Sequence, residues 1–217
     1  MERTITVRGH GTVTAAPDRI EITLRLESRD MDYSAASAQA DIRIGDLTQS
    51  VTRAGFSADD LKTTSYHIQP EYESVCGPDG VYRQERKGYL CEHTLLLAFD
   101  YDRRRLDDVV TALASCPAVP GFDIRFTVRD PEALRDRLLT EAAAHARSRA
   151  ETLCAASGVR LGTLLRIEYD RGDRPFYSDT SCTMAFGGAM LRAAKAADIA
   201  PEDIRLDDTA VFVWAIE

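Results

Sequence analysis

Apolar and polar residues alternate along several stretches of the chain with the two-residue period of half-buried β-strands. The clearest stretch covers 19–27, where the isoleucines and leucines from Ile20 to Leu26 share one face and polar side chains share the other. One polar face is typical of antiparallel pairing. The same alternation predicts strands over 4–13, 61–72, 88–99, 122–128, 161–169 and 204–216. We expect the first two strands, which flank a turn at 16–18, to form a hairpin.

Other stretches repeat apolar or small residues every three or four positions, as amphipathic helices do. The longest predicted helix covers about 131–157. Asp130 suits its N-cap, Pro131 its first position, and Gly158 its left-handed stop. Its buried stripe would contain Leu134, Leu138, Ala142, Ala146, Ala150 and Leu153. Further helices are predicted over 32–54, with Gly45 at a close helix contact, over 103–115, and more weakly over 186–197.

These elements predict an α+β fold, with a mixed, largely antiparallel sheet and helices packed on it. The strands within 61–99 would form a long, projecting β-hairpin. The last strand is apolar on both faces, so we expect it to be central or covered by another subunit. The segment 170–185 is polar and irregular. We expect one domain over 1–217, with substructures at 1–100 and 101–217.

Composition narrows the class of protein. The net charge of −8 over 217 residues argues against a nucleic-acid binder. No apolar run is long enough to span a membrane. The five cysteines are scattered with no CxxC pair, which is typical of free thiols in a reducing compartment. The first ten residues lack the apolar segment of a signal peptide, which predicts a cytoplasmic location. A trimmed chain would leave the cell envelope or periplasm as the alternative.

Few residues have the pattern of a chemical site. His67, Cys91 and His93 could converge on a metal, but the alternation of the strand turns His67 toward solvent. Glu141, His145 and Arg149 have the spacing of a solvated charge ladder along a helix. Cys76 and Cys182, which fall in predicted loops, are the candidates for a redox-reactive thiol. We therefore predict no catalytic, cofactor-binding or metal-binding residues.

Aromatic residues instead suggest a surface for self-association. Four tyrosines lie on or near the predicted long hairpin, and tyrosine is enriched at protein interfaces. A lone hairpin is also marginal in water unless something covers it. With the apolar last strand, the candidate residues are Tyr66, Tyr72, Tyr82, Tyr89, Phe212 and Trp214.

Several phrases, taken in order, resemble the SIMPL-domain family, which includes bacterial periplasmic immunogenic and envelope proteins. They are ITVRGHGTVTAAPD (5–18), GFSADDLKTTSYHIQPEY (55–72), RKGY (86–89), FTVRDPEAL (126–134), ARSRAETLCAASGV (146–159) and IAPEDI (199–204). The resemblance implies an α+β domain, oligomerisation, a role linked to the envelope or to oxidative-stress tolerance, and no enzymatic activity. The chain departs from the family pattern in its five cysteines and in its missing export signal.

Three hypotheses follow, in order of preference. The first is a non-enzymatic, self-assembling protein of this type. The second is a small-molecule or peptide binding module that uses the segment 170–188 as a lid. The third is a thiol- or metal-dependent enzyme.

Overall fold

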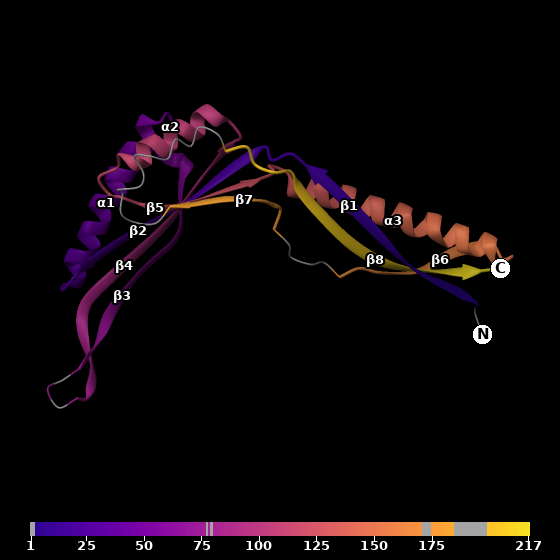
Figure 1. The fold of residues 1–217 in the computed structure, drawn as a ribbon, viewed down its shortest axis with the longest axis horizontal. Helices are drawn as coiled ribbons and strands as arrows, with labels where there is room; N and C mark the ends of the chain where they lie inside the picture. Colours follow the sequence, from indigo (N-terminus) through magenta and orange to yellow (C-terminus); the bar gives the residue numbers. More distant parts are fainter. Residues whose placement is uncertain (1–2, 77, 79, 171–174, 185–198) are drawn as a thin grey trace. The chain divides into compact units, whose positions relative to one another are not determined.

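A computed structural model of the protein describes residues 3–76, 78, 80–170, 175–184 and 199–217 (Figure 1). It confirms the predicted α+β fold. In chain order the elements are β1 (Thr4–Ala15), β2 (Arg19–Asp30), α1 (Tyr33–Arg53), a 3-10 turn (Ala58–Asp60), β3 (Leu61–Cys76), β4 (Tyr82–Asp100), α2 (Arg103–Ala114), β5 (Gly121–Thr127), α3 (Pro131–Ala156), β6 (Leu161–Glu168), β7 (Tyr177–Met184) and β8 (Ile204–Ile216).

The chain divides into two compact units. The first unit contains Met1–Asp18, Thr127–Asp179 and Glu202–Glu217, and the second contains Arg19–Phe126 and Thr180–Pro201. Because the chain passes between them more than once, each unit combines segments that are distant in sequence. Each unit has its own sheet and its own buried apolar side chains.

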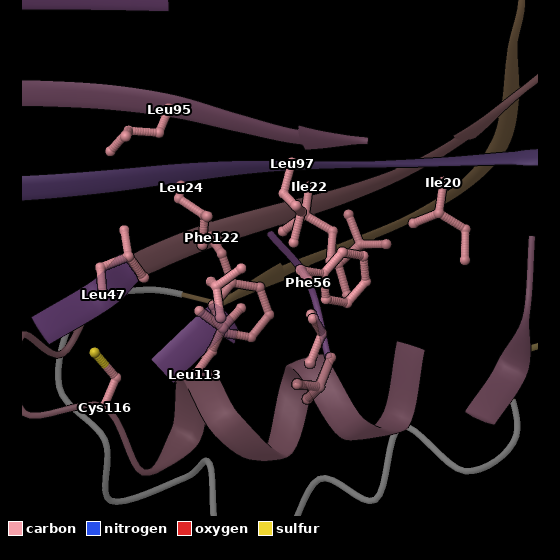
Figure 2. Close-up of a cluster of buried hydrophobic side chains, with 14 of the residues drawn as sticks. Ile20, Ile22, Leu24, Leu47, Phe56, Leu95, Leu97, Leu113, Cys116 and Phe122 are labelled. Atoms are coloured by element: carbon pink, nitrogen blue, oxygen red, sulfur yellow. The ribbon is translucent and has the colours of Figure 1, made fainter. Parts of the chain in front are cut away.

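The second unit is built on a five-stranded sheet with the order β3-β4-β2-β5-β7. Both β2 and β3 run antiparallel to β4. Helix α1 packs on β2, β4 and α2. Figure 2 shows the resulting core, in which β2 supplies Ile20, Ile22 and Leu24, β4 supplies Leu97, and α2 supplies Leu113. The two-residue period of β2 thus places its apolar face beneath the helices, as the sequence predicts.

The first unit is built on a three-stranded antiparallel sheet with the order β1-β8-β6. Helix α3 lies along β1 and β8 (Figure 1). Its buried stripe matches the prediction except at one position, because Leu153 is 51% exposed and Cys154 is buried instead. Cys154 continues the four-residue steps from Ala146 and Ala150. The doubly apolar last strand, β8, is central, as expected.

The predicted hairpin between the first two strands is wrong. β1 pairs with β8, whereas β2 pairs with β4 in the other sheet. The turn at Pro17 directs the chain out of the first sheet. The N–H of Asp18 donates to the carbonyl oxygen of Thr127 at 3.1 Å, and its carboxylate accepts from the N–H of Arg129 at 2.6 Å. These bonds hold the turn in a conformation that is not a hairpin.

Two further expectations need correction. Part of the segment predicted to be irregular, 170–185, forms strand β7, and the Thr183 hydroxyl donates to Asp123 of β5 at 2.6 Å. Hydrogen bonds from polar side chains attach this strand to its neighbour. Its sequence therefore lacks the alternation of apolar and polar residues from which strands are predicted. At Gly45, an added Cβ would meet no described atom within 4 Å, so the expected close helix contact is not found in the described part of the chain. The predicted helix over 186–197 lies outside the described residues.

Candidate self-association surfaces

Beyond the end of β2, strands β3 and β4 continue as a two-stranded ribbon, here called the arm and defined as residues 72–87 (Figure 1). The last β2 residue, Asp30, pairs with Tyr89. At this point Gly88 adopts a φ of +136°, and a Cβ there would lie 2.5 Å from the carbonyl oxygen of Asp30. A register shift in β3 between Glu71 and Tyr72 marks the same place. A glycine is therefore required where the arm leaves the sheet.

Every described residue of the arm is exposed. The pairs Tyr72–Arg86, Ser74–Gln84 and Cys76–Tyr82 place one set of side chains on one face, here called the tyrosine face. Tyr72 is 57% exposed and Tyr82 is 71% exposed. The amide of Gln84 donates to Ser74 at 3.2 Å between them. The tyrosine face is thus broad and mainly uncharged.

The opposite face of the arm is charged. Glu73 lies directly across from Glu85, and Val75 lies across from Arg83. Like charges in such a cross-strand pair destabilise a sheet. Lys87 offsets this repulsion through an ion pair with Glu73 at 2.9 Å. The arm is therefore amphipathic although both of its faces are exposed.

The other two predicted tyrosines lie outside the arm, Tyr89 at its base and Tyr66 farther back along β3, where it pairs with His93. The Tyr66 ring meets His93 edge-on, with ring centroids 5.1 Å apart, and its hydroxyl lies 3.5 Å from that of Ser37 in α1. Tyr89 meets Tyr33 of α1 edge-on at 5.7 Å. These contacts attach the two tyrosines to their own unit, so they support the arm rather than extend its exposed face.

Phe212 and Trp214 do not lie on an exposed surface. They are 6% and 7% exposed, and they pack with Ala146 and Ala150 of α3. Their rings stack on each other with centroids 5.6 Å apart. These two candidates are therefore core residues of the first unit, because α3 covers the face of β8 from which they project.

The free edge of β1 is closed by side chains from α3. An added Cβ on Gly9 would lie 2.0 Å from the carbonyl oxygen of Ala142, so the helix backbone lies directly against the strand. From this position, Nδ1 of His145 accepts from the N–H of His10 at 3.0 Å. The Glu141 carboxylate accepts from the N–H of Thr12 at 3.3 Å. The predicted charge ladder thus includes two side chains that cap an edge strand.

The other edge of the same sheet is formed by β6, which is open. Within the described part of the chain no further strand pairs with it. Its apolar side chains are exposed: Leu164 by 46%, Leu165 by 44% and Ile167 by 53%. Bare edges with apolar side chains are sites of strand pairing between chains. The two edges of this sheet therefore differ sharply in protection.

The possible metal ligands His67, Cys91 and His93 do not converge on one site. His67 pairs with Glu92 on the face of the sheet opposite to His93, which pairs with Tyr66. Nε2 of His93 lies 2.9 Å from the Thr63 hydroxyl, and burial lowers the pKa of His93. Among the described residues, no three histidine, cysteine or acidic side chains gather as a metal site.

None of the five cysteines, all of which lie in the described part of the chain, forms a disulfide. Cys91, Cys116 and Cys154 are buried, and Cys76 at the end of β3 is exposed. Cys182 belongs to β7 rather than to a loop, and burial, followed by the charge of Asp123, raises its pKa. A raised pKa lowers the thiolate fraction, so Cys182 is a poor nucleophile.

A hollow of about 360 Å³ lies in the first unit. Its walls include the carboxylates of Asp170, Asp207 and Asp208, of which Asp208 accepts from the Tyr169 hydroxyl at 2.9 Å. On another wall, the Arg135 guanidinium lies 4.9 Å from the ring centroid of Phe176. Acidic groups thus outnumber basic ones in this hollow.

A family model described as "SIMPL: Protein of unknown function (DUF541)" matches residues 5–214, which is nearly the whole chain. The protein belongs to the SIMPL family. This match includes both units and confirms the resemblance stated from the sequence phrases.

Named relatives of this SIMPL chain are bacterial. It is 27% identical over 168 residues to the "Uncharacterized protein YggE" of Edwardsiella ictaluri, a match that covers 76% of the chain and 67% of that relative. It is 23% identical over 163 residues to the "26 kDa periplasmic immunogenic protein" of Brucella melitensis and to that of Brucella abortus, covering 75% of the chain and 65% of each relative. The chain thus matches about two-thirds of these relatives' length.

No helix in the described ranges of the SIMPL chain is both long and apolar enough to cross a membrane.

Two features of these surfaces are not predicted from the sequence. They are the capping role of Glu141 and His145 and the open edge at β6. Gly9 and Gly11 could have indicated the capping role, because paired glycines allow another backbone to approach a strand closely. The run Leu164-Leu165-Arg166-Ile167 could have indicated the open edge, because its apolar residues do not all lie on one face of the strand.

Proposed function

We propose that this SIMPL protein is a non-enzymatic subunit that assembles with copies of itself through the tyrosine face of the arm. The observation that carries the proposal is the exposure of every described residue of the arm, including Tyr72 and Tyr82 on the tyrosine face. A two-stranded ribbon without a covering layer is marginally stable in water. A second copy would supply that layer.

The chemistry of the arm favours a protein partner. Tyrosine buries a large area at low conformational cost and is enriched at interfaces. Ser74 and Gln84 lie between the two tyrosines and already bond to each other, so covering them leaves few unsatisfied polar groups. The charged face, with Glu73 across from Glu85, is suited to remain in water. One face of the arm would therefore be buried and the other solvated.

The non-enzymatic part of the proposal rests on how the titratable side chains are used. His145 and Glu141 accept hydrogen bonds from the edge of β1, and His93 is engaged by Thr63. These groups have structural partners that account for their positions. The names of the relatives state no activity. The link to envelope or oxidative-stress tolerance is part of the proposal through the family resemblance alone.

The molar mass in solution tests the assembly. We expect sedimentation equilibrium at micromolar concentration to give a multiple of the 24.0 kDa chain mass. Tyr72→Ser with Tyr82→Ser should lower this mass and leave the circular dichroism spectrum unchanged, because both side chains are exposed. Val75→Ser, on the opposite face of the same ribbon, is the matched control and should assemble normally. A strict monomer of the unaltered chain would refute the proposal.

We also propose that the protein resides in the cell envelope, although its sequence predicts the cytoplasm. The support is the word "periplasmic" in the names of two relatives. Fractionation of cells that express the full-length gene should recover the protein with periplasmic markers. Recovery with cytoplasmic markers would restore the prediction made from the sequence.

The hollow in the first unit supports a second candidate function, the binding of a small cation. Its size is within the usual range for ligand pockets, and its three aspartates would attract positive charge. Of the segment predicted to act as a lid, 171–174 and 185–188 lie outside the described residues, and Tyr177–Met184 forms β7. A thermal-shift titration with putrescine should raise the melting temperature, and Asp208→Asn should weaken the effect. No shift at millimolar putrescine would remove this candidate.

A further inference from the structure

The contrast between the two edges of the three-stranded sheet indicates where a second contact between copies lies. His145 and Glu141 close the β1 edge with hydrogen bonds to its backbone. The β6 edge has no such closure within the described residues, and Ile167, near the C-terminal end of β6, is 53% exposed. Proteins that avoid edge-to-edge pairing normally cover or charge such strands. One edge of this sheet is therefore protected and the other is available.

The strand register shows which backbone groups of β6 point outward. The N–H of Ile216 donates to the carbonyl oxygen of Arg3, so Ile216 turns its backbone groups toward β1. By alternation, Phe212 also faces β1, whereas Val213 and Val211 face β6, where they pair with Arg166 and Glu168. Ile167 lies between these two paired residues. It therefore turns its own N–H and C=O to the open edge.

We infer that β6 pairs antiparallel with β6 of a second copy, in a register centred on Ile167. In this register the outward N–H and C=O of each Ile167 meet those of the other, as a hydrogen-bonded pair. The inference rests on the proposed self-assembly, to which it adds a second interface beside the arm. It extends the three-stranded sheet of each copy into one continuous sheet of six strands.

Charge complementarity supports this register over its neighbours. With Ile167 opposite its own copy, each Arg166 lies across from a Glu168 of the other chain. Within one chain these two side chains already share a face and an ion pair at 2.8 Å. Two opposite-charge cross-strand pairs would thus form across the symmetry axis, on the face opposite to the two exposed isoleucines. A register shifted by one residue in either direction would lose both pairs.

Charge reversal tests the pairing. Arg166→Glu places glutamate across from Glu168 twice, and Glu168→Arg places arginine across from Arg166 twice. Each single variant should weaken the interface about tenfold, and the double variant should restore it. The Tyr72→Ser, Tyr82→Ser background isolates this interface from the arm. Failure of the double variant to recover, while the unaltered protein still assembles, would overturn the inference but leave the proposed function standing.

A cysteine cross-link tests the register. In a Cys76→Ser background, Ile167→Cys should oxidise to a covalent dimer, because the Cα separation of a hydrogen-bonded antiparallel pair lies within disulfide range. Thr163→Cys on the same strand is the control and should remain monomeric on denaturing gels. Equal cross-linking at both positions, or a cross-link to another protein, would refute the register. A monomeric unaltered chain with no cross-link would refute the proposed function as well.

Discussion

Gly9→Ala adds one methyl group at a place where the backbone of α3 lies against β1. The new Cβ would lie 2.0 Å from the carbonyl oxygen of Ala142, whereas real Cβ contacts are essentially never under 3.0 Å. The obstacle is helix backbone, which cannot rotate away as a flexible side chain does. The helix must therefore move outward by about 1 Å, the difference between these two distances.

The cost of this displacement has two parts. Overpacking of a well-packed core costs about 1–3 kcal/mol. A helix that moves outward also loosens the hydrogen bonds from His145 and Glu141 to β1, which contribute roughly 1 kcal/mol each. We therefore expect a loss of about 3 kcal/mol in the free energy of unfolding. For a chain of this length, that corresponds to a fall of roughly 6–12 °C in melting temperature.

Trp214 makes the measurement specific to the first unit, since it is the chain's single tryptophan and lies in the cluster beneath α3. Urea titrations followed by its fluorescence should show a lower midpoint for Gly9→Ala. Gly45→Ala is the matched control, because its Cβ meets nothing within 4 Å in the middle of α1. It should instead stabilise the second unit by about 0.5–1 kcal/mol in circular dichroism. An unchanged fluorescence midpoint for Gly9→Ala would refute the close helix contact.

Two further predictions concern ionisable side chains of the second unit. Burial alone would raise the pKa of Asp123, but hydrogen bonds from Thr183 and Arg125, with nearby positive charge, lower it overall. Its stabilising effect is thus present above the unfolded pKa of about 3.9 and lost as the pH falls below it. Asp123→Asn should cost about 1–3 kcal/mol at pH 7; a loss that persists unchanged at pH 2 would contradict this. Under native conditions a thiol reagent should modify exposed Cys76 first and Cys182 slowly, and a fast phase that survives Cys76→Ser would contradict this order.

The sequence predicts most of the individual elements because local rules decide them. Asp130 caps α3 through a hydrogen bond to a backbone N–H group, as its position predicts, and Asp102 caps α2 in the same way. Gly55 and Gly158 have φ values of +88° and +73° after α1 and α3. The alternation in β2 and β4 correctly assigns the faces that become the core of the second unit.

Partner choice between strands is decided at longer range, and there the sequence is less informative. β1 and β2 have the alternation of a hairpin, but Asp18 donates a hydrogen bond to Thr127 and accepts one from Arg129, and β2 joins another sheet. β7 has almost no apolar pattern, since polar bonds such as that from Thr183 to Asp123 hold it. The apolar pattern of β8 also predicts Phe212 and Trp214 at an interface, because the sequence does not show that α3 covers them.

The glycines of β1 connect packing with the protection of the sheet edge. Gly9 and Gly11 face α3 across small residues such as Ala142, so the helix backbone approaches the strand closely. Only when the helix is this close can the side chains of Glu141 and His145 accept hydrogen bonds from the backbone N–H groups of Thr12 and His10. A larger residue at either glycine would move the helix and expose a second bare edge. The same substitution that weakens the first unit should therefore also promote pairing through β1, whereas the outer edge of β6 already has no strand beside it among the described residues.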